Sequence, residues 1–297
     1  RGGGLFVVPL ATLTTALLLR YSPTYVALFG VVTVVAIWAL RWRSFSFAGL
    51  YDGVAQTTFN MVAVTGACAA AGMVIGGITM TGLAGKVSEL LTLIAGANLA
   101  LTLIFAAVMT IILGMGMPTP AAYALSAALV GPTLVGDFGI APMQAHLFLL
   151  YFSVLSAMTP PVAVAAYAAA GIADSQPVGL AVSACKLAVA AFLLPFAFIY
   201  GPGLLLMNEP LWIVAAIVST TAAVILLSVA AEGYWRRPIG WPVRLVMLAA
   251  ALFLLAPQVV PMAIGTALGA AALTMLALGV GRPRGAEASA PATDGGA

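Results

Sequence analysis

Charged residues are nearly absent from this sequence. They make up 6% of its 297 residues, whereas hydrophobic residues make up 63% and the mean hydropathy is +1.16. A soluble domain carries about a quarter charged residues, so that class is excluded. Several apolar runs approach the roughly 20 residues that cross a hydrocarbon core: 26–40, 99–113, 187–206 and 211–231. The sequence therefore predicts an all-α polytopic membrane protein.

Histidine and cysteine are also scarce, which excludes several kinds of chemistry. Cys68 and Cys185 lie in apolar segments without a CxxC or Cys/His cluster, so we expect two small buried hydrophobes and no metal site or disulfide. The single histidine, His146, is interpreted as a hydrogen-bonded packing residue on an apolar helix. No HExxH, nucleophile elbow or P-loop is present. We expect neither an enzyme nor an ATP-driven pump, and no cofactor.

Basic residues are scattered along the chain, which argues against nucleic-acid binding and instead informs topology. Cytoplasmic loops are rich in Lys and Arg. Placing 41–43, Lys186 and 236–244 inside leaves 208–209 outside, with single spans on either side. The apolar run 245–281 is basic at both ends, so we expect a helical hairpin bent near 257–261.

Two stretches interrupt apolar helices with Gly and Pro, "GMGMPTPAAY" at 114–123 and "SAMTPPVA" at 156–163. Proline removes an N–H and displaces the carbonyl one turn earlier. Such freed groups persist in a membrane only where they are buried in protein or line a wet cavity. Paired, interrupted segments point to the binding site of a transporter. We therefore predict an ion and substrate site formed by Gly114, Gly116, Pro118, Thr119, Pro120, Ser156, Thr159, Pro160 and Pro161.

The predicted ligands of this site are neutral oxygens. Hard cations prefer oxygen, and about five or six such ligands would suit Na⁺. We expect the backbone carbonyls of Gly114, Gly116 and Thr159 to bind Na⁺ as the coupling ion, with no buried carboxylate required. The alternative is that both breaks are kinks that help helices pack. Two breaks, each with a Thr-Pro step and a half-length apolar segment beside it, favour the site.

The segment 61–82 is crowded with Gly, Ala and Thr, and it follows a mildly amphipathic stretch at 47–60. Small residues let helices approach closely. We expect 61–82 to pack against protein more than against lipid.

The chain resembles a known family at both breaks. "LGMGMPTPAAYALSAALVGPTLV", "GIAPMQAHLFLLYFSVLSAMTPPVAVAAYAAAGIA" and "PFAFIYGPGLLL" are similar to the large membrane subunit of tripartite ATP-independent periplasmic (TRAP) transporters. The similarity runs from about residue 18 to residue 206 and is greatest to fused permeases that work with TAXI-class solute-binding proteins.

The resemblance implies an elevator-type fold of the ion-transporter superfamily, with inverted repeats, a re-entrant hairpin and broken helices. It implies import of small organic anions, typically carboxylates, by Na⁺ symport (H⁺ in some members), across a bacterial or archaeal cytoplasmic (inner) membrane. A periplasmic solute-binding protein would deliver the substrate. By motif, 114–120 and 156–161 fall on the ion- and substrate-binding breaks of the second repeat.

The resemblance also organises the chain. Residues 1–208 match the C-terminal part of the large-permease transmembrane domain, 209–281 resemble a C-terminal extension of additional helices, and 282–297 are expected to be a disordered tail. The sequence begins "RGGG" without an initiator Met. We therefore expect a fragment whose partners include the upstream permease region, membrane lipid and the binding protein.

Two other functions stay open on the residues alone. One is a Na⁺/dicarboxylate-type carrier that needs no binding protein. The other is a membrane scaffold subunit that transports nothing. Neither the substrate, the choice between Na⁺ and H⁺ nor the oligomeric state follows from the sequence.

Overall fold

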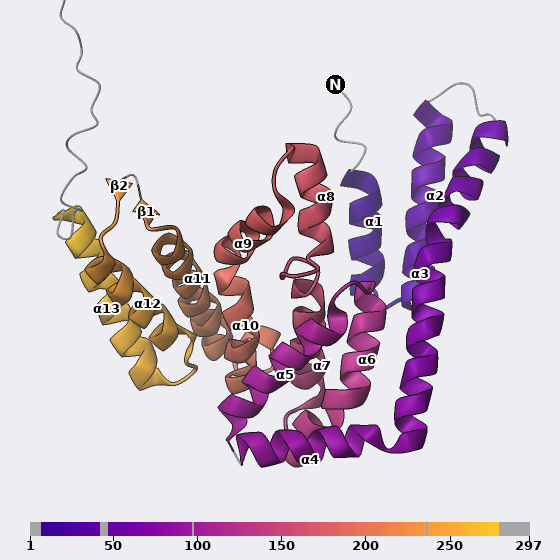
Figure 1. The fold of residues 1–297 in the computed structure, drawn as a ribbon. Coiled ribbons are helices and arrows are strands. Elements are labelled where there is room, and N and C mark those ends of the chain that lie inside the picture. The colour runs from indigo at the N-terminus through magenta and orange to yellow at the C-terminus, as the bar shows by residue number, and fades with distance from the viewer. Residues whose placement is uncertain (1–6, 42–46, 97, 236, 279–297) are drawn as a thin grey trace, which may run out of the picture. The chain divides into compact units, whose positions relative to one another are not determined.

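The computed structural model describes residues 7–41, 47–96, 98–235 and 237–278, which are largely helical (Figure 1). The helices are α1 (Val7–Leu18), α2 (Pro23–Arg41), α3 (Phe47–Thr81), α4 (Leu83–Ala95), α5 (Leu99–Gly114), α6 (Thr119–Pro132), α7 (Pro142–Leu155), α8 (Val164–Ala173), α9 (Pro177–Leu187), α10 (Val189–Tyr200), α11 (Pro210–Glu232), α12 (Trp241–Leu255) and α13 (Val259–Ala277). A π-helix, η2 (Thr133–Asp137), follows α6, and a 3-10 turn, η3 (Pro202–Leu205), follows α10. Two short strands, β1 (Tyr234–Trp235) and β2 (Arg237–Pro238), pair antiparallel between α11 and α12.

The chain divides into two compact units, residues 1–65 and 66–297, and α3 runs from the first into the second. In the first unit α1 and α2 pack so closely that a Cβ at Gly30 would lie 2.8 Å from Leu13 Cδ2. The two apolar helices predicted at 5–19 and 26–40 are confirmed. Arg43 of the basic turn and the predicted tail at 282–297 lie outside the described residues.

Helix α3 joins 47–60 and most of 61–82 into one helix of 35 residues. Within its small-residue part, Ala71 and Ile78 are buried, but a Cβ added at Gly72 or Gly76 would meet nothing within 4 Å. The expected packing against protein is therefore met at Ala71 and Ile78 but not at these two glycines within the described part of the chain.

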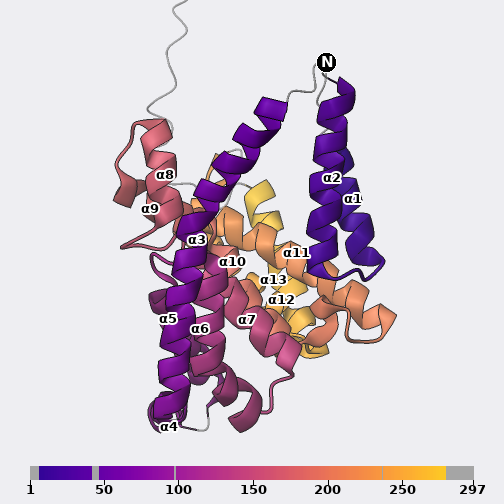
Figure 2. The same cartoon turned by 90° about the vertical axis from the view of Figure 1, so that its right-hand side faces the viewer.

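Helices α5, α6, α7 and α10 build the core of the second unit, and α4 runs across one end of this bundle (Figures 1 and 2). Phe148 and Phe152 of α7 are almost fully buried in it. On α5 four of the six buried residues recur every four positions, so they share one face: Thr102, Ala106, Thr110 and Gly114. These small side chains let α6 and α7 approach α5 closely.

A buried glutamine completes the end of α10. Pro202 has no N–H to offer the Phe198 carbonyl one turn earlier. Gln144 of α7 donates from Nε2 to the carbonyls of Phe198 at 2.7 Å and Ile199 at 3.2 Å. The amide therefore both satisfies a carbonyl that proline leaves open and ties α7 to α10.

Helices α9 and α10 meet at a bend of 44° and together are long and apolar enough to form one span. If they form one span, it begins at Pro177, earlier than the run predicted at 187–206. Lys186 lies in the last turn of α9, where its Nζ pairs with Glu232 of α11 at 3.4 Å. The pair places Lys186 on the same side as the basic loop after α11, as predicted from charge.

Helices α11, α12 and α13 pack side by side (Figure 1). Residues 256–258 separate α12 from α13, which confirms the predicted hairpin. Arg244 caps α11 by donating from Nε to the Ala230 carbonyl at 2.8 Å and from Nη2 to the Ala231 carbonyl at 3.1 Å. The last carbonyls of a helix lack N–H partners, so this guanidinium stabilises its end.

Three helices of the described chain are long and apolar enough to cross a membrane: α3, α11 and α13. The bent α9–α10 pair makes a fourth if it counts as one span. Helices α5 and α7 are apolar but shorter, at 16 and 14 residues.

Candidate functional site

The first predicted break is present between α5 and α6. Helix α5 ends at Gly114 and α6 begins at Thr119. The connection turns at Gly116, whose φ of +78° is a conformation that glycine adopts without a steric penalty. Within the turn the Met117 N–H donates to the Gly114 carbonyl at 3.3 Å. The helical ladder is therefore interrupted where the Gly and Pro residues predicted it.

The second break separates α7, which ends at Leu155, from α8, which begins at Val164. Here the chain forms a compact turn in which the Ala163 N–H donates to the Thr159 carbonyl at 3.2 Å. The first turn of α8 folds back, and the Ala165 N–H donates to the Ala157 carbonyl at 2.9 Å. This prediction too is confirmed.

The structure brings the two breaks together. Gly114 lies against the side chain of Ser156, since a Cβ at position 114 would be 2.9 Å from Ser156 Cβ and 3.4 Å from Ala122 Cβ. A Cβ at Gly116 would lie 3.6 Å from Val162 Cγ1. Residues from the end of α5 thus contact both ends of the second break.

The predicted site residues differ in exposure. Gly114 and Ser156 are buried where the breaks meet, whereas Gly116, Pro120 and Pro161 are exposed. The other four are half-buried: Pro118, Thr119, Thr159 and Pro160. The contacts join Gly114 and Gly116 to the second break, while Thr119 and Pro120 form the first turn of α6.

The hydroxyl groups of the second break are directed at their own backbone. Ser156 Oγ donates to the Ser153 carbonyl and Thr159 Oγ1 to the Leu155 carbonyl, each at 2.8 Å. Both oxygens therefore keep their lone pairs for a ligand. The Thr119 hydroxyl makes no hydrogen bond to another described residue.

The three carbonyls predicted to bind Na⁺ are not fully used within the described chain. The Gly114 and Thr159 carbonyls each accept one backbone hydrogen bond, and the Gly116 carbonyl accepts none from the described residues. A carbonyl oxygen has two lone pairs, so each can still accept a ligand. Neither break contains a charged residue, so the site is neutral. Ion binding at these atoms stays a prediction.

Sequence reasoning missed the place of Cys185 in this arrangement. Its thiol, on α9, donates to the Met158 carbonyl at 3.6 Å and interacts with the Thr159 side chain. Cys185 and Cys68 are both free, as expected, but they are half-buried where the sequence predicted buried side chains. No sequence signal marks the contact, because α9 reaches the break only through the fold.

The single histidine makes the packing hydrogen bond that its sequence position suggested. His146 Nδ1 on α7 lies 3.0 Å from the Tyr123 hydroxyl on α6. Tyr123 follows the first break by one turn. Among the described residues, no three His, Cys, Asp or Glu side chains gather as they would around a metal ion.

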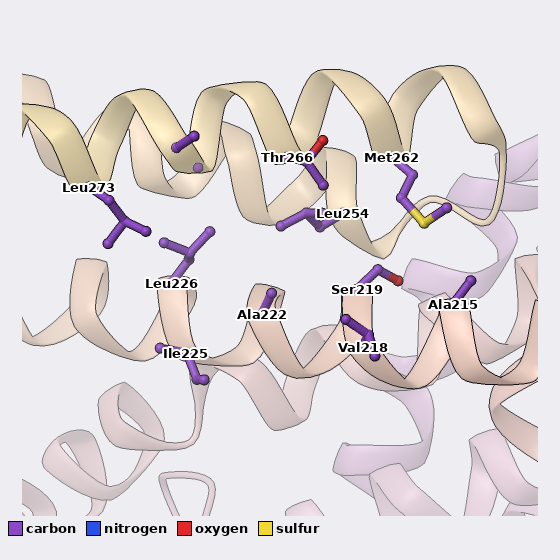
Figure 3. Close-up of a pocket in the computed structure, with 12 residues that line it drawn as sticks. Ala215, Val218, Ser219, Ala222, Ile225, Leu226, Leu254, Met262, Thr266 and Leu273 are labelled. Carbon is purple, nitrogen blue, oxygen red and sulfur yellow. The ribbon is translucent and has the colours of Figure 1, made fainter.

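A separate groove of about 600 Å³ lies between α11 and α13, with Leu254 of α12 at its base (Figure 3). Its polar side chains are Ser219 and Thr266, and it contains no charged group. An ion or a carboxylate has little to bind there, so the groove is not the candidate site. It is lined by Ala215, Val218, Ser219, Ala222, Ile225, Leu226, Leu254, Met262, Thr266, Gly269, Ala270 and Leu273.

Comparison with known families decides the kind of molecule. The model of the DctM component of tripartite ATP-independent periplasmic transporters matches residues 4–213. The chain belongs to the DctM family. Both breaks of this DctM-family chain lie inside the matched region, while α12, α13 and most of α11 lie beyond it. Neither a curated protein nor a solved structure matches the chain.

Membership confirms the TRAP large permease that the sequence motifs resemble. The chain is therefore an all-α, multi-pass membrane protein of a transporter family rather than of an enzyme family. TRAP permeases work with a periplasmic solute-binding protein and a small permease. The division of the chain at residue 208 and the two binding breaks stay predictions.

Proposed function

We propose that this DctM-family chain is part of a Na⁺-driven permease that imports small organic anions, typically carboxylates, across a bacterial or archaeal inner membrane. A TAXI-type periplasmic binding protein would deliver the substrate. The observation that carries the proposal is the contact between the two breaks, Gly114 against Ser156. The contact joins two segments whose carbonyl and hydroxyl oxygens still have lone pairs and which carry no charged residue, and transporters bind Na⁺ in sites of this kind.

The other half of the site is proposed to lie upstream. In this proposal the chain is the C-terminal half of a fused permease with inverted repeats, and it works by an elevator movement. The first repeat would complete the ligand set, because a Na⁺ ion needs about five or six oxygens. The exposure of Gly116 and Pro161 in this chain is consistent with such a partner.

Uptake into proteoliposomes of the full-length protein tests the proposal. We expect uptake to require both an inward Na⁺ gradient and the cognate binding protein. Undiminished uptake without the binding protein would instead favour a dicarboxylate-type carrier. No uptake under any gradient, with the protein folded, would favour a scaffold subunit.

Substitutions at the breaks then test the site itself. Thr119→Ala and Thr159→Ala should raise the Na⁺ concentration for half-maximal uptake by about tenfold, the effect of losing roughly 1.4 kcal/mol of binding. Thr221→Ala is the matched control, because Thr221 on α11 also donates to a carbonyl one turn earlier, at 2.7 Å, but is remote from the breaks in sequence. Equal Na⁺ dependence in all three variants would contradict the assignment.

A further inference from the structure

Thr110 carries a hydroxyl group without a hydrogen-bond partner, one turn before the first break. Its residue is 0% exposed, and Oγ1 has no partner in the described structure. Thr102 on the same helix donates to the Asn98 carbonyl four residues earlier, at 3.1 Å. Thr110 does not make this local bond. Thr133 of η2 is the other buried threonine of the described chain whose hydroxyl has no partner. A buried hydroxyl left unpaired is destabilising, so its oxygen needs a partner that the described polypeptide does not supply.

Two buried serines are expected at the same level of the bundle from the geometry of the helices. Ser126 of α6 is 0% exposed and Ser153 of α7 is 1% exposed. Gly114 contacts Ala122 and Ser156 at the breaks. Helix α6 runs antiparallel to α5 and α7. One helical turn away from the breaks, Thr110 therefore lies next to Gly114 on α5. In the same way Ser126 follows Ala122 on α6, and Ser153 precedes Ser156 at the end of α7. This level is about 6 Å from the breaks along the helix axis.

The serine oxygens are free to act as acceptors. Ser126 Oγ donates its proton to the Ala122 carbonyl, and Ser153 Oγ donates to the Leu149 carbonyl, each at 2.8 Å. A hydroxyl whose proton is engaged still has lone pairs. Ser156, at the level of the breaks, donates to the Ser153 carbonyl and so connects the two levels.

We propose that Thr110, Ser126 and Ser153 form a second, deeper position for Na⁺, with Thr110 Oγ1 as a ligand. The inference rests on the proposed Na⁺ coupling and adds a side-chain position to the carbonyls of the breaks. A buried water could satisfy the same three oxygens. Only an ion would make this layer respond to the Na⁺ concentration, which gives the test its discriminating measurement.

The test measures the thermal unfolding midpoint of the purified full-length protein against NaCl, with choline chloride keeping the ionic strength constant. A ligand of the folded state raises the midpoint with its concentration. Thr110→Val keeps the shape but removes the hydroxyl, and it should raise the Na⁺ concentration for the half-maximal shift about tenfold. Thr110→Ser should stay close to wild type. Thr102→Val, on the same buried face of α5, should also leave the Na⁺ concentration for the half-maximal shift unchanged.

Each outcome decides the question. If Thr110→Val responds to Na⁺ as wild type does, or changes equally in Na⁺ and choline, the layer holds water or nothing and the inference fails. If Thr110→Val does not fold, Ser126→Ala and Ser153→Ala carry the same test. If wild type itself shows no shift with Na⁺, the proposed Na⁺ coupling fails first, and the ion position fails with it.

Discussion

At the scale of single residues, the absence of a side chain at Gly114 brings the two breaks together. The small residue lets the side chain of Ser156 lie where a Cβ would otherwise be, because that Cβ would approach Ser156 Cβ to 2.9 Å. Ser156 is 1% exposed, so it has little room to move aside. The contact therefore depends on the small volume of glycine at position 114.

Gly114→Ala should consequently destabilise the protein by about 1–3 kcal/mol, the usual cost of overpacking a well-packed interior. It should also reduce Na⁺-dependent uptake, because the breaks are forced apart. The unfolding midpoint in detergent and proteoliposome uptake measure the two effects. Gly131→Ala is the control, since a Cβ there meets nothing within 4 Å. Equal midpoints for both variants would show that the bundle can relax around position 114.

At the scale of the helices, a carbonyl left without its helical donor is satisfied by a side chain from another helix. Pro202 leaves the Phe198 carbonyl without its helical donor, and Gln144 supplies one from α7. Arg244 of α12 likewise donates to the last carbonyls of α11, which every helix end leaves without N–H partners. Such bonds are stronger inside a membrane protein's core than at its surface, since water cannot replace them.

Gln144→Met should therefore lower the free energy of unfolding by about 1–3 kcal/mol, because two buried carbonyls lose their donor. The thermal midpoint should fall, and hydrogen exchange should rise at the end of α10. Gln176→Met is the control, because Gln176 is exposed and makes no capping bond at the start of α9. If the two variants unfold at the same temperature, the Gln144 amide contributes nothing net.

At the scale of the whole molecule, the ends of α11 set the topology of the second unit. Asn208 precedes this helix of 23 residues, and Glu232 closes it beside Lys186. The helix is long enough to span a hydrocarbon core of about 30 Å. The positive-inside rule places the Glu232 end in the cytoplasm.

Cysteine labelling checks this topology. In a background of Cys68→Ser and Cys185→Ser, Asn208→Cys should react with a membrane-impermeant maleimide from the outside, and Glu232→Cys only in inverted vesicles. The Lys186–Glu232 pair is half-exposed and contributes about 0–1 kcal/mol, so its loss leaves the fold intact. Labelling of both cysteines from one side would overturn the spanning assignment of α11.

The sequence anticipated much of this molecule but misplaced some of its parts. Both breaks and the hairpin of α12 and α13 follow from Pro and Gly, whose effects on the backbone are local. The structure places Lys186 in the last turn of α9, directly before α10, and its partner Glu232 lies on a helix that no local pattern connects with it. Small residues at 61–82 predicted protein contacts that the described chain provides at Ala71 and Ile78 but not at Gly72 or Gly76.

Hydropathy, the scarcity of charge and the positions of proline by themselves determined an all-α membrane protein with two interrupted helices, since each acts over a few neighbouring residues. That Gly114 lies against Ser156, that Cys185 reaches Met158, and that Thr110 is buried without a partner were decided only by the tertiary structure. The reason is physical. Such contacts depend on how helices distant in sequence pack, and a local pattern carries no record of which faces will meet.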